Sequence, residues 1–470
     1  MKINPFNNIF DHQAKNINFA AFILAGTSFL SFIFGLIYDR LLAARFGLGP
    51  ELDVYFVAFR IPDFISTVLI LGAIGAAVIP IFSQCLVKSR EESFEYLSNL
   101  LNLFLILLII VGVILFIFTP QLISWIAPGF SAEKKESTIL LSRIMFLSPI
   151  FLGISNVISG VLRVFRRFLI TAFAPVMYNL GSIIGVLFFV PKIGLPGLAW
   201  GIVLGGFLHL LIQIPILIKV GFKFKKILRF SDPNFLKTLK LTIPRSIGLA
   251  ANQINLIVVT AIASGLAAGS VAAFNLADTF TRPLVILIGV SFSTAAFPAL
   301  SLAFVQEKKE KFTEIYFSAF NKIILFILPS SFILFILRDL IVEIILKVGK
   351  FSLIDTRLTA ACLGMFCLGI FAQSLILLIT KAFYSIQNTI IPAIASILGM
   401  VINVIFCFLF VRLLSFPNSF QQFFINFLKL PNLNEIRVIG LPLAISLSAI
   451  FQLVLLIFFF KKRIKYRAFA

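Results

Sequence analysis

Charged residues lie beside a proline in a long apolar stretch of the sequence. In the stretch from Asp53 to Ser83, Arg60 and Asp63 flank Pro62. A charge inside a membrane segment costs roughly 2.5 to 3.5 kcal/mol even on the more permissive insertion scales, so such side chains are expected to face protein or a water-filled cavity. Arginine binds phosphate and carboxylate groups through a bidentate fork. The stretch therefore predicts a broken, charged helix that forms part of a transport path through a membrane.

A second apolar segment repeats this combination of charge and proline. The run NLADTFTRPLVILIG, residues 275–289, carries Asp278 and Arg282 beside Pro283. Arg245 lies beside Pro244 in a third segment, and each proline frees backbone groups for other bonds. Aspartates among these cations are candidate cation or proton sites. We therefore predict the following substrate-binding candidates: Arg60, Arg245, Arg282, Asp39, Asp63 and Asp278.

These polar residues also have a structural interpretation. Arg60 and Asp63 are spaced to form an ion pair within one helix, and Asp278 and Arg282 lie one turn apart. His209 is expected to be a packed polar residue rather than a ligand. Asparagines in membrane helices more often bond a neighbouring helix than a substrate, which we expect of Asn156, Asn179 and Asn403. Two cations near helix ends either snorkel to the interface or face a cavity: Lys381 and Arg143.

The composition identifies the class of protein. Of 470 residues, 60% are hydrophobic and 13% are charged, and the mean hydropathy is +1.08, as in a polytopic membrane protein. The net charge of +21 lies in short loops between apolar runs, which favours cytoplasmic loops over nucleic-acid binding. The four cysteines lie in or beside apolar runs and are interpreted as packing residues. Without catalytic, phosphate-cradling or metal-ligand motifs, we predict no enzyme activity and no cofactor.

Apolar runs of at least about 18 residues predict the membrane-spanning helices. Basic residues crowd the segment 219–237, the turn around Arg166 and the residues after 460, which fall on one side of a twelve-helix protein. We therefore expect a plasma-membrane protein with both termini cytoplasmic, a first helix that is retained rather than cleaved, and a loop at 87–97. The twelve runs are 18–38, 54–86, 98–119, 138–163, 169–190, 194–218, 239–265, 270–304, 313–337, 357–383, 388–413 and 438–460.

An internal repeat divides these helices into two sets of six. AAVIPIFS, residues 76–83, is answered by TAAFPALS, residues 294–301, so that Pro80 and Pro298 lie 218 positions apart. The loop 414–436 is interpreted as an insertion in the second half. Six helices per half keep the same orientation, so we expect two pseudo-symmetric bundles around a central cavity that work by alternating access. The predicted parts are an N-terminal segment 1–17, bundles 18–218 and 238–460, a basic linker 219–237 serving as hinge or crossing loop, and a basic tail 461–470.

Several motifs resemble those of one known family. The run FGLIYDRLLAARFGLGPELDVYFVAFRIPDF, residues 34–64, followed by GAIGAAVIPIFS, resembles the start of the MurJ (MviN) lipid II flippases, which belong to the multidrug, oligosaccharidyl-lipid and polysaccharide exporter superfamily. Shorter matches follow along nearly the whole chain: Ala127-Pro128-Gly129-Phe130, Phe173-Ala174-Pro175, Ala277-Asp278 and Gly349-Lys350-Phe351.

The resemblance implies two six-helix bundles around a cationic cavity that flip an undecaprenyl-pyrophosphate-linked disaccharide peptide. Typical members carry two further helices, which form a groove for the lipid tail. Arginines that line the family's cavity are replaced in this sequence by Phe32, Tyr38, Ser66 or Thr67, and Thr279. We therefore expect Arg60, Arg245 and Arg282 to supply the cavity charge.

The leading prediction is therefore a bacterial plasma-membrane flippase for lipid II, acting as a monomer among membrane lipids and in contact with cell-wall synthases. Two alternatives remain open. Because the family's cavity arginines are replaced, a polysaccharide-unit or multidrug exporter of the same superfamily is a stronger alternative for this chain than for a typical member. A non-transporting scaffold for cell-wall enzymes is the alternative from another class.

Overall fold

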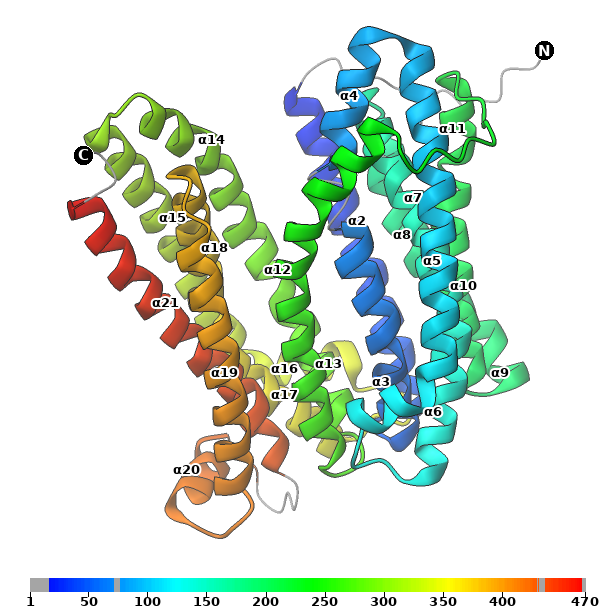
Figure 1. Cartoon of the computed structure of the whole chain (residues 1–470). Helices are drawn as coiled ribbons and strands as arrows, with labels where there is room; N and C mark the ends of the chain where they lie inside the picture. The colour runs from blue at the N-terminus through cyan, green and yellow to red at the C-terminus, as the bar shows by residue number, and fades with distance from the viewer. Residues whose placement is uncertain (1–16, 72–76, 429, 431–435, 467–470) are drawn as a thin grey trace. The chain divides into compact units, whose positions relative to one another are not determined.

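The computed structural model describes residues 17–71, 77–428, 430 and 436–466, which contain helices and no strand (Figure 1). Eleven of the described helices or helix pairs are long and apolar enough to cross a membrane. The all-α class predicted from the sequence is confirmed.

The first half contains α2 (Ile17–Phe46), α3 (Pro50–Ile65), η1 (Ser66–Leu71), α4 (Ile79–Lys88), α5 (Arg90–Ile126), α6 (Ala132–Met145), α7 (Leu147–Val164), α8 (Phe168–Ile184), η3 (Gly185–Phe189), α9 (Val190–Ile193), α10 (Pro196–Leu211) and α11 (Ile214–Lys219).

The second half repeats this organisation. Its elements are α12 (Pro233–Ser264), α13 (Ser270–Leu284), η4 (Val285–Val290), α14 (Ser291–Val305), α15 (Lys309–Ile336), α16 (Arg338–Leu346), α17 (Leu353–Cys367), α18 (Ile370–Ser385), α19 (Ile390–Leu413), α20 (Ser419–Leu428), η5 (Ile436–Ile439) and α21 (Gly440–Tyr466). The chain forms two compact units. One contains residues up to 42 together with 54–253, and the other contains residues 43–53 together with 254–470.

Two predicted loops contain helix. The loop expected at 87–97 is largely the first turns of α5, which begins at Arg90 because the Ser89 hydroxyl accepts a hydrogen bond from the Glu92 amide at 3.0 Å. The predicted insertion at 414–436 contains the ten-residue helix α20. Both segments contain polar residues and therefore lack the long apolar runs from which the helices were predicted.

The span predicted at 54–86 is a broken helix, as expected from the charges and prolines in it. The α-helix α3 passes into the π-helix η1 four residues after Pro62, and α4 follows beyond the undescribed residues 72–76. The repeat-related segment has the same form, because α13 contains Pro283 and passes into the π-helix η4. Proline removes a backbone donor and disturbs the helical ladder, and π-turns occur often at functional sites.

The carbonyl groups released by two prolines are bonded again by side chains. Pro62 cannot donate to the carbonyl of Ala58, which instead accepts a hydrogen bond from the buried Ser142 hydroxyl at 3.1 Å. Pro120 likewise releases the carbonyl of Phe116, which accepts from Arg143 Nε at 3.3 Å. Membrane lipid offers no donors, so polar side chains from α6 complete both broken helices.

Glycines allow α8 and α10 to pack at backbone contact. Gly181 on α8 and Gly185 at the start of η3 face Gly205 and Gly201 on α10, each pair being four residues apart, as in small-residue packing motifs of membrane helices. A Cβ atom at Gly201 would lie 2.7 Å from the Cα atom of Gly185. No side chain fits between these helices, which makes them a closely packed part of the first unit.

We predict that Gly201→Leu destabilises the purified protein, because the new side chain must force α8 and α10 apart. Overpacking of this kind costs roughly 1 to 3 kcal/mol, which a lower midpoint of thermal unfolding in detergent will reveal. Gly112→Leu on α5 is the matched control, since an added Cβ atom meets nothing within 4 Å there. Equal midpoints for the two variants would contradict the packing described.

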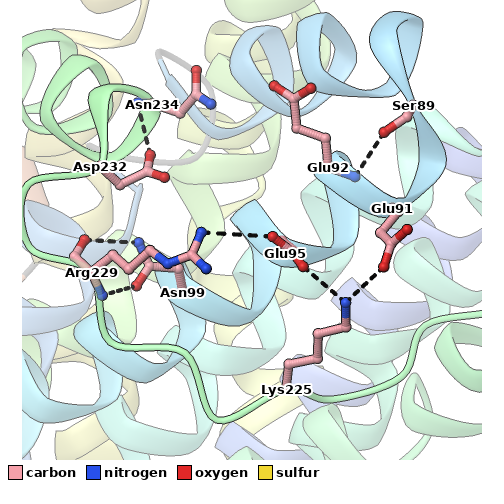
Figure 2. Close-up of polar contacts among 9 residues, drawn as sticks. All are labelled: Ser89, Glu91, Glu92, Glu95, Asn99, Lys225, Arg229, Asp232 and Asn234. Carbon is pink, nitrogen blue, oxygen red and sulfur yellow. Dashed lines mark hydrogen bonds and ion pairs between the residues drawn. The ribbon is translucent and has the colours of Figure 1, made fainter.

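The predicted linker is held against α5 along its length. Residues 222–229, which we call the strap, form a segment without helix or strand. Asn99 on α5 accepts a hydrogen bond from the Arg229 amide at 2.7 Å and donates one to the Arg229 carbonyl at 3.0 Å (Figure 2). Asn102 donates to the carbonyls of Lys225 and Ile227 at 3.1 and 2.9 Å. Two asparagine amides therefore satisfy much of the backbone of the strap.

Glutamates of α5 neutralise part of the charge of the strap. Lys225 Nζ lies 2.9 Å from Glu95 and 3.0 Å from Glu91 (Figure 2). The hydrogen bonds that Lys225 donates to Glu95 and then to Glu91 raise the pKa of Lys225 above its ordinary value. Because the pKa of Lys225 is higher in the folded protein, the stabilisation that its ion pairs provide is complete below the ordinary pKa of lysine. This stabilisation is lost as the pH rises through the higher pKa of the folded protein. The strap therefore stays paired at neutral pH.

We predict that Asn99→Ala releases the strap, because two backbone groups of Arg229 lose their partners. Leaving such groups unbonded costs about 1 to 3 kcal/mol, so trypsin should cleave after Lys225 and Arg229 at least roughly tenfold faster through local opening. Asn321→Ala, at an exposed asparagine of α15, serves as the control. Unchanged cleavage in the Asn99 variant would show that the asparagine does not hold the strap.

Candidate functional site

The first proline-broken helix places its charges against α12. Arg60 on α3 is 7% exposed, and Asp63 one turn later is half-buried. The Asp63 carboxylate accepts a hydrogen bond at 3.3 Å from Gln253, a buried residue of α12. The π-helix η1 is bonded to the same helix, because the Ser246 hydroxyl donates to the Val68 carbonyl at 2.7 Å. Polar contacts therefore join the broken helix to α12 within the first unit.

Arg245 and Asp39 lie close in sequence to these contacts. Arg245 precedes Ser246 on α12 and is exposed within the first unit. Asp39 on α2 is half-buried and follows Tyr38. The Tyr38 hydroxyl is hydrogen-bonded to the hydroxyl of Tyr55 on α3 at 2.7 Å, and both tyrosines are buried. At the position where the family resemblance expects an arginine, the chain thus has a neutral, bonded phenol.

The second proline-broken helix carries an ion pair. Arg282 Nε and Nη2 each lie 2.6 Å from Oδ2 of Asp278, one turn earlier on α13. The Thr281 hydroxyl also contacts this carboxylate, at 3.3 Å. The side chain of Arg282 is 60% exposed and that of Asp278 is 22% exposed within their unit. The pairing considered from the sequence is present, and exposure leaves the guanidinium accessible from outside its own helix.

Asp53 is an important residue that the sequence search did not select. Its carboxylate is 2% exposed and accepts hydrogen bonds from the amides of Gly269, at 2.6 Å, and Ala272, at 2.9 Å. These amides are at the N-terminus of α13, where the helix dipole favours a negative charge. Because Asp53 also lies in the first turn of its own helix α3, nothing in the local sequence indicated a partner 216 positions away.

Asp53 belongs to a short segment that packs with the second unit. Within this segment, residues 43–53, the Ala44 carbonyl accepts from the Lys350 amide at 2.8 Å and the Leu48 amide donates to Asp355 at 3.4 Å. Gly349 adopts a φ of 61°, and a Cβ atom there would collide with the backbone of Ala44. The end of α2 and the start of α3 are therefore integrated into the second unit.

Other polar residues of the helices mainly bond protein. Asn179 donates to the Ser31 carbonyl at 2.8 Å, and Asn403 donates to Asn255 at 2.8 Å, both across to another helix as expected. Asn156 instead bonds the Leu152 carbonyl of its own helix. The buried imidazole of His209 lies 2.7 Å from the Ser155 hydroxyl in a polar cluster between α7 and α10. Neither this cluster nor any other group of described residues brings together three metal-ligating side chains.

Comparisons with known proteins agree with this arrangement. Residues 42–470 match the family described as lipid II flippase MurJ. The chain belongs to this family. It is 30% identical over 384 residues to the probable lipid II flippase MurJ of Buchnera aphidicola subsp. Acyrthosiphon pisum, covering 80% of this chain and 74% of that protein. It is also 27% identical to lipid II flippase MurJ of Burkholderia cenocepacia over 413 residues, covering 85% and 79%. The resemblance found in the sequence is confirmed.

Solved structures give the same family and fold. A lipid II flippase MurJ in an inward closed conformation is similar with a TM-score of 0.76 and 27% identity, covering 94% of this chain and 87% of that chain. An inward-facing multidrug resistance MATE transporter of the MOP superfamily has a TM-score of 0.71 at 17% identity, covering 93% and 94%. The second likeness shows the fold alone. The predicted exporter fold is therefore confirmed.

We predict that replacing Asp53 destabilises the protein in a graded way. Asp53→Asn retains an acceptor but loses the charge at the N-terminus of α13, and Asp53→Ala loses both. Buried hydrogen bonds to charged groups contribute about 1.5 to 3 kcal/mol, so midpoints of thermal unfolding should fall from wild type to Asn to Ala. Glu51→Ala, two positions away and exposed, should change nothing. Identical midpoints in all four proteins would contradict the assigned capping role.

Proposed function

We propose that this protein translocates the peptidoglycan precursor lipid II across the bacterial plasma membrane. The observation that carries the proposal is the match of residues 42–470 to the lipid II flippase MurJ family. Two proline-broken helices, α3–η1 and α13–η4, occupy repeat-related positions and bear charges that a simple membrane anchor has no use for. We further propose that the chain acts as a monomer and contacts cell-wall synthases.

We propose that both termini are cytoplasmic and that bundles 18–218 and 238–460 rock against each other in alternating access. Support for the orientation comes from basic residues in the segment 219–237 and after residue 460. The strap is bonded to α5, whereas α12 passes from one compact unit into the other after residue 253. The linker therefore acts as the crossing loop, and bending during transport falls to α12.

In this proposal, the positive charge that binds the pyrophosphate group comes from Arg60, Arg245 and Arg282. Exposure within their units makes Arg245 and Arg282 accessible to an anion, and guanidinium groups can bind it bidentately. Asp278 holds Arg282 in place until an anionic substrate competes for it. Asp39 and Asp63 are half-buried and are proposed as cation or proton sites, as is Asp278.

A polysaccharide-unit or multidrug exporter is the second candidate function. It is favoured by the uncharged residues at positions where the family resemblance expects arginine, of which Tyr38 is buried and bonded to Tyr55. Depletion of the protein in its host, followed by expression of an unrelated lipid II flippase, separates the two. Restored growth supports lipid II as the cargo, whereas failure to restore it supports another cargo or a scaffold.

We predict that alanine replacement of Arg60, Arg245 or Arg282 slows lipid II translocation into proteoliposomes. Loss of a charge-assisted hydrogen bond to the substrate costs about 1.5 to 3 kcal/mol, which corresponds to a translocation rate that is lower by roughly tenfold or more. Arg357→Ala, at an exposed arginine of α17, should translocate at the wild-type rate. If all three variants also do so, the assignment of the arginines is wrong, although the protein can still be a flippase.

A further inference from the structure

A cavity of about 300 Å³ lies between α14 and α15 in the second unit. Its walls come from one face of each helix, since the lining residues recur at the helical spacing of three and four positions. On α14 they are Phe292, Ala295, Ala296 and Ala299, and on α15 they are Lys311, Glu314, Ile315, Ser318, Ala319 and Lys322.

The cavity exists because the alanines of α14 are small, whereas a stacked pair of phenylalanine rings holds α14 and α15 in contact. Ala295 and Ala299 are exposed although α14 and α15 pack as an antiparallel pair. The rings of Phe292 and Phe326 stack at 5.9 Å between centroids and 10° between planes, which brings the helices into contact at one end. Away from this contact the alanines leave room that other side chains of the unit do not fill. The result is a groove with an apolar floor.

Three charged side chains line this groove. Lys311, Glu314 and Lys322 make no side-chain ion pair or hydrogen bond with any residue in the described part of the chain. Some lysines of the protein are paired, because Lys347 pairs with Glu343 and Lys225 pairs with Glu95. Two ammonium groups and one carboxylate therefore face the cavity with a net positive charge.

The groove lies where α15 enters its apolar part. Lys322 is the last charged residue of α15 before the run from Ile323 to Ile336. Lys311 lies eleven positions earlier, or about 16 Å along the helix, near the turn that joins α14 to α15. In the same part of the unit, the Phe460 ring of α21 lies 4.6 Å from the Tyr316 ring of α15. In a membrane, such a boundary between charged and apolar residues suits the level of the headgroups.

We propose that this groove binds the headgroup of an anionic glycerophospholipid, with its negative charge on the wall that carries Lys311 and Lys322 and its glycerol and upper acyl carbons over the alanines. Basic pockets between membrane helices are suited to such headgroups. The net positive charge favours an anionic lipid over a zwitterionic one. In the orientation proposed above, the turn that joins α14 to α15 is cytoplasmic, so the lipid belongs to the cytoplasmic leaflet. Only this assignment depends on that orientation, and binding itself is independent of the transported cargo.

Binding can be measured on the full chain in nanodiscs or detergent by native mass spectrometry with phosphatidylglycerol. The double variant Lys311→Gln/Lys322→Gln should bind roughly tenfold or more weakly. Lys308→Gln/Lys309→Gln removes the same charge from neighbouring residues that do not line the cavity and should bind like wild type. Ala299→Phe should also weaken binding, because it fills the groove without changing any charge.

Glu314→Gln tests the sign of the charge. Binding of phosphatidylglycerol should become tighter, because a carboxylate that repels the phosphate is removed. Weaker binding in this variant, or a preference of the wild type for phosphatidylethanolamine, would overturn the anionic assignment and point to a zwitterionic headgroup. Competition by inorganic phosphate alone, with no dependence on Ala299→Phe, would overturn the lipid in favour of a free anion. Equal loss in both double-lysine variants would overturn the site.

Discussion

The constraint on which the rest of the structure depends is that lipid offers polar groups no partner. Each break in a membrane helix must therefore be repaired by protein, and each charge within the membrane must face protein or a water-filled cavity. Ser142 bonds the carbonyl released by Pro62, and Arg143 bonds the one released by Pro120. The carboxylate of Asp53 bonds amides at the start of α13. These contacts allow the chain to keep irregular, charged helices at positions where continuous apolar ones would be simpler.

The two units distribute stiffness in different ways. In the first unit, glycines bring α8 and α10 to backbone contact, and asparagines fix the strap on α5. In the second, the segment 43–53 is integrated through backbone bonds and through Asp53. Within each unit a π-helix interrupts the helical hydrogen bonds, as η1 does in the first and η4 in the second. A transporter that rocks between states needs this combination of rigid bodies and weakened helices.

Much of the fold followed from the sequence because apolar runs and repeated motifs are local signals. The spacing of Pro80 and Pro298 predicted the duplication, and the charges beside Pro62 and Pro283 predicted two interrupted helices. The polar start of α5 and the helix α20 were missed, since neither has a long apolar run. Asp53 was missed because its partners on α13 are far away in sequence. The role of the α5 glutamates was hidden for the same reason, since only the folded chain brings the strap against them.

The central claim is that Arg282 serves an anionic substrate and not only its own helix. The most direct test is translocation of lipid II by the exchanged double variant Asp278→Arg/Arg282→Asp in proteoliposomes. The exchange preserves the ion pair on α13 but moves the guanidinium by one turn, about 5.4 Å. We predict normal folding and strongly reduced translocation. Wild-type translocation by the exchanged protein would show that the pair only stabilises the helix.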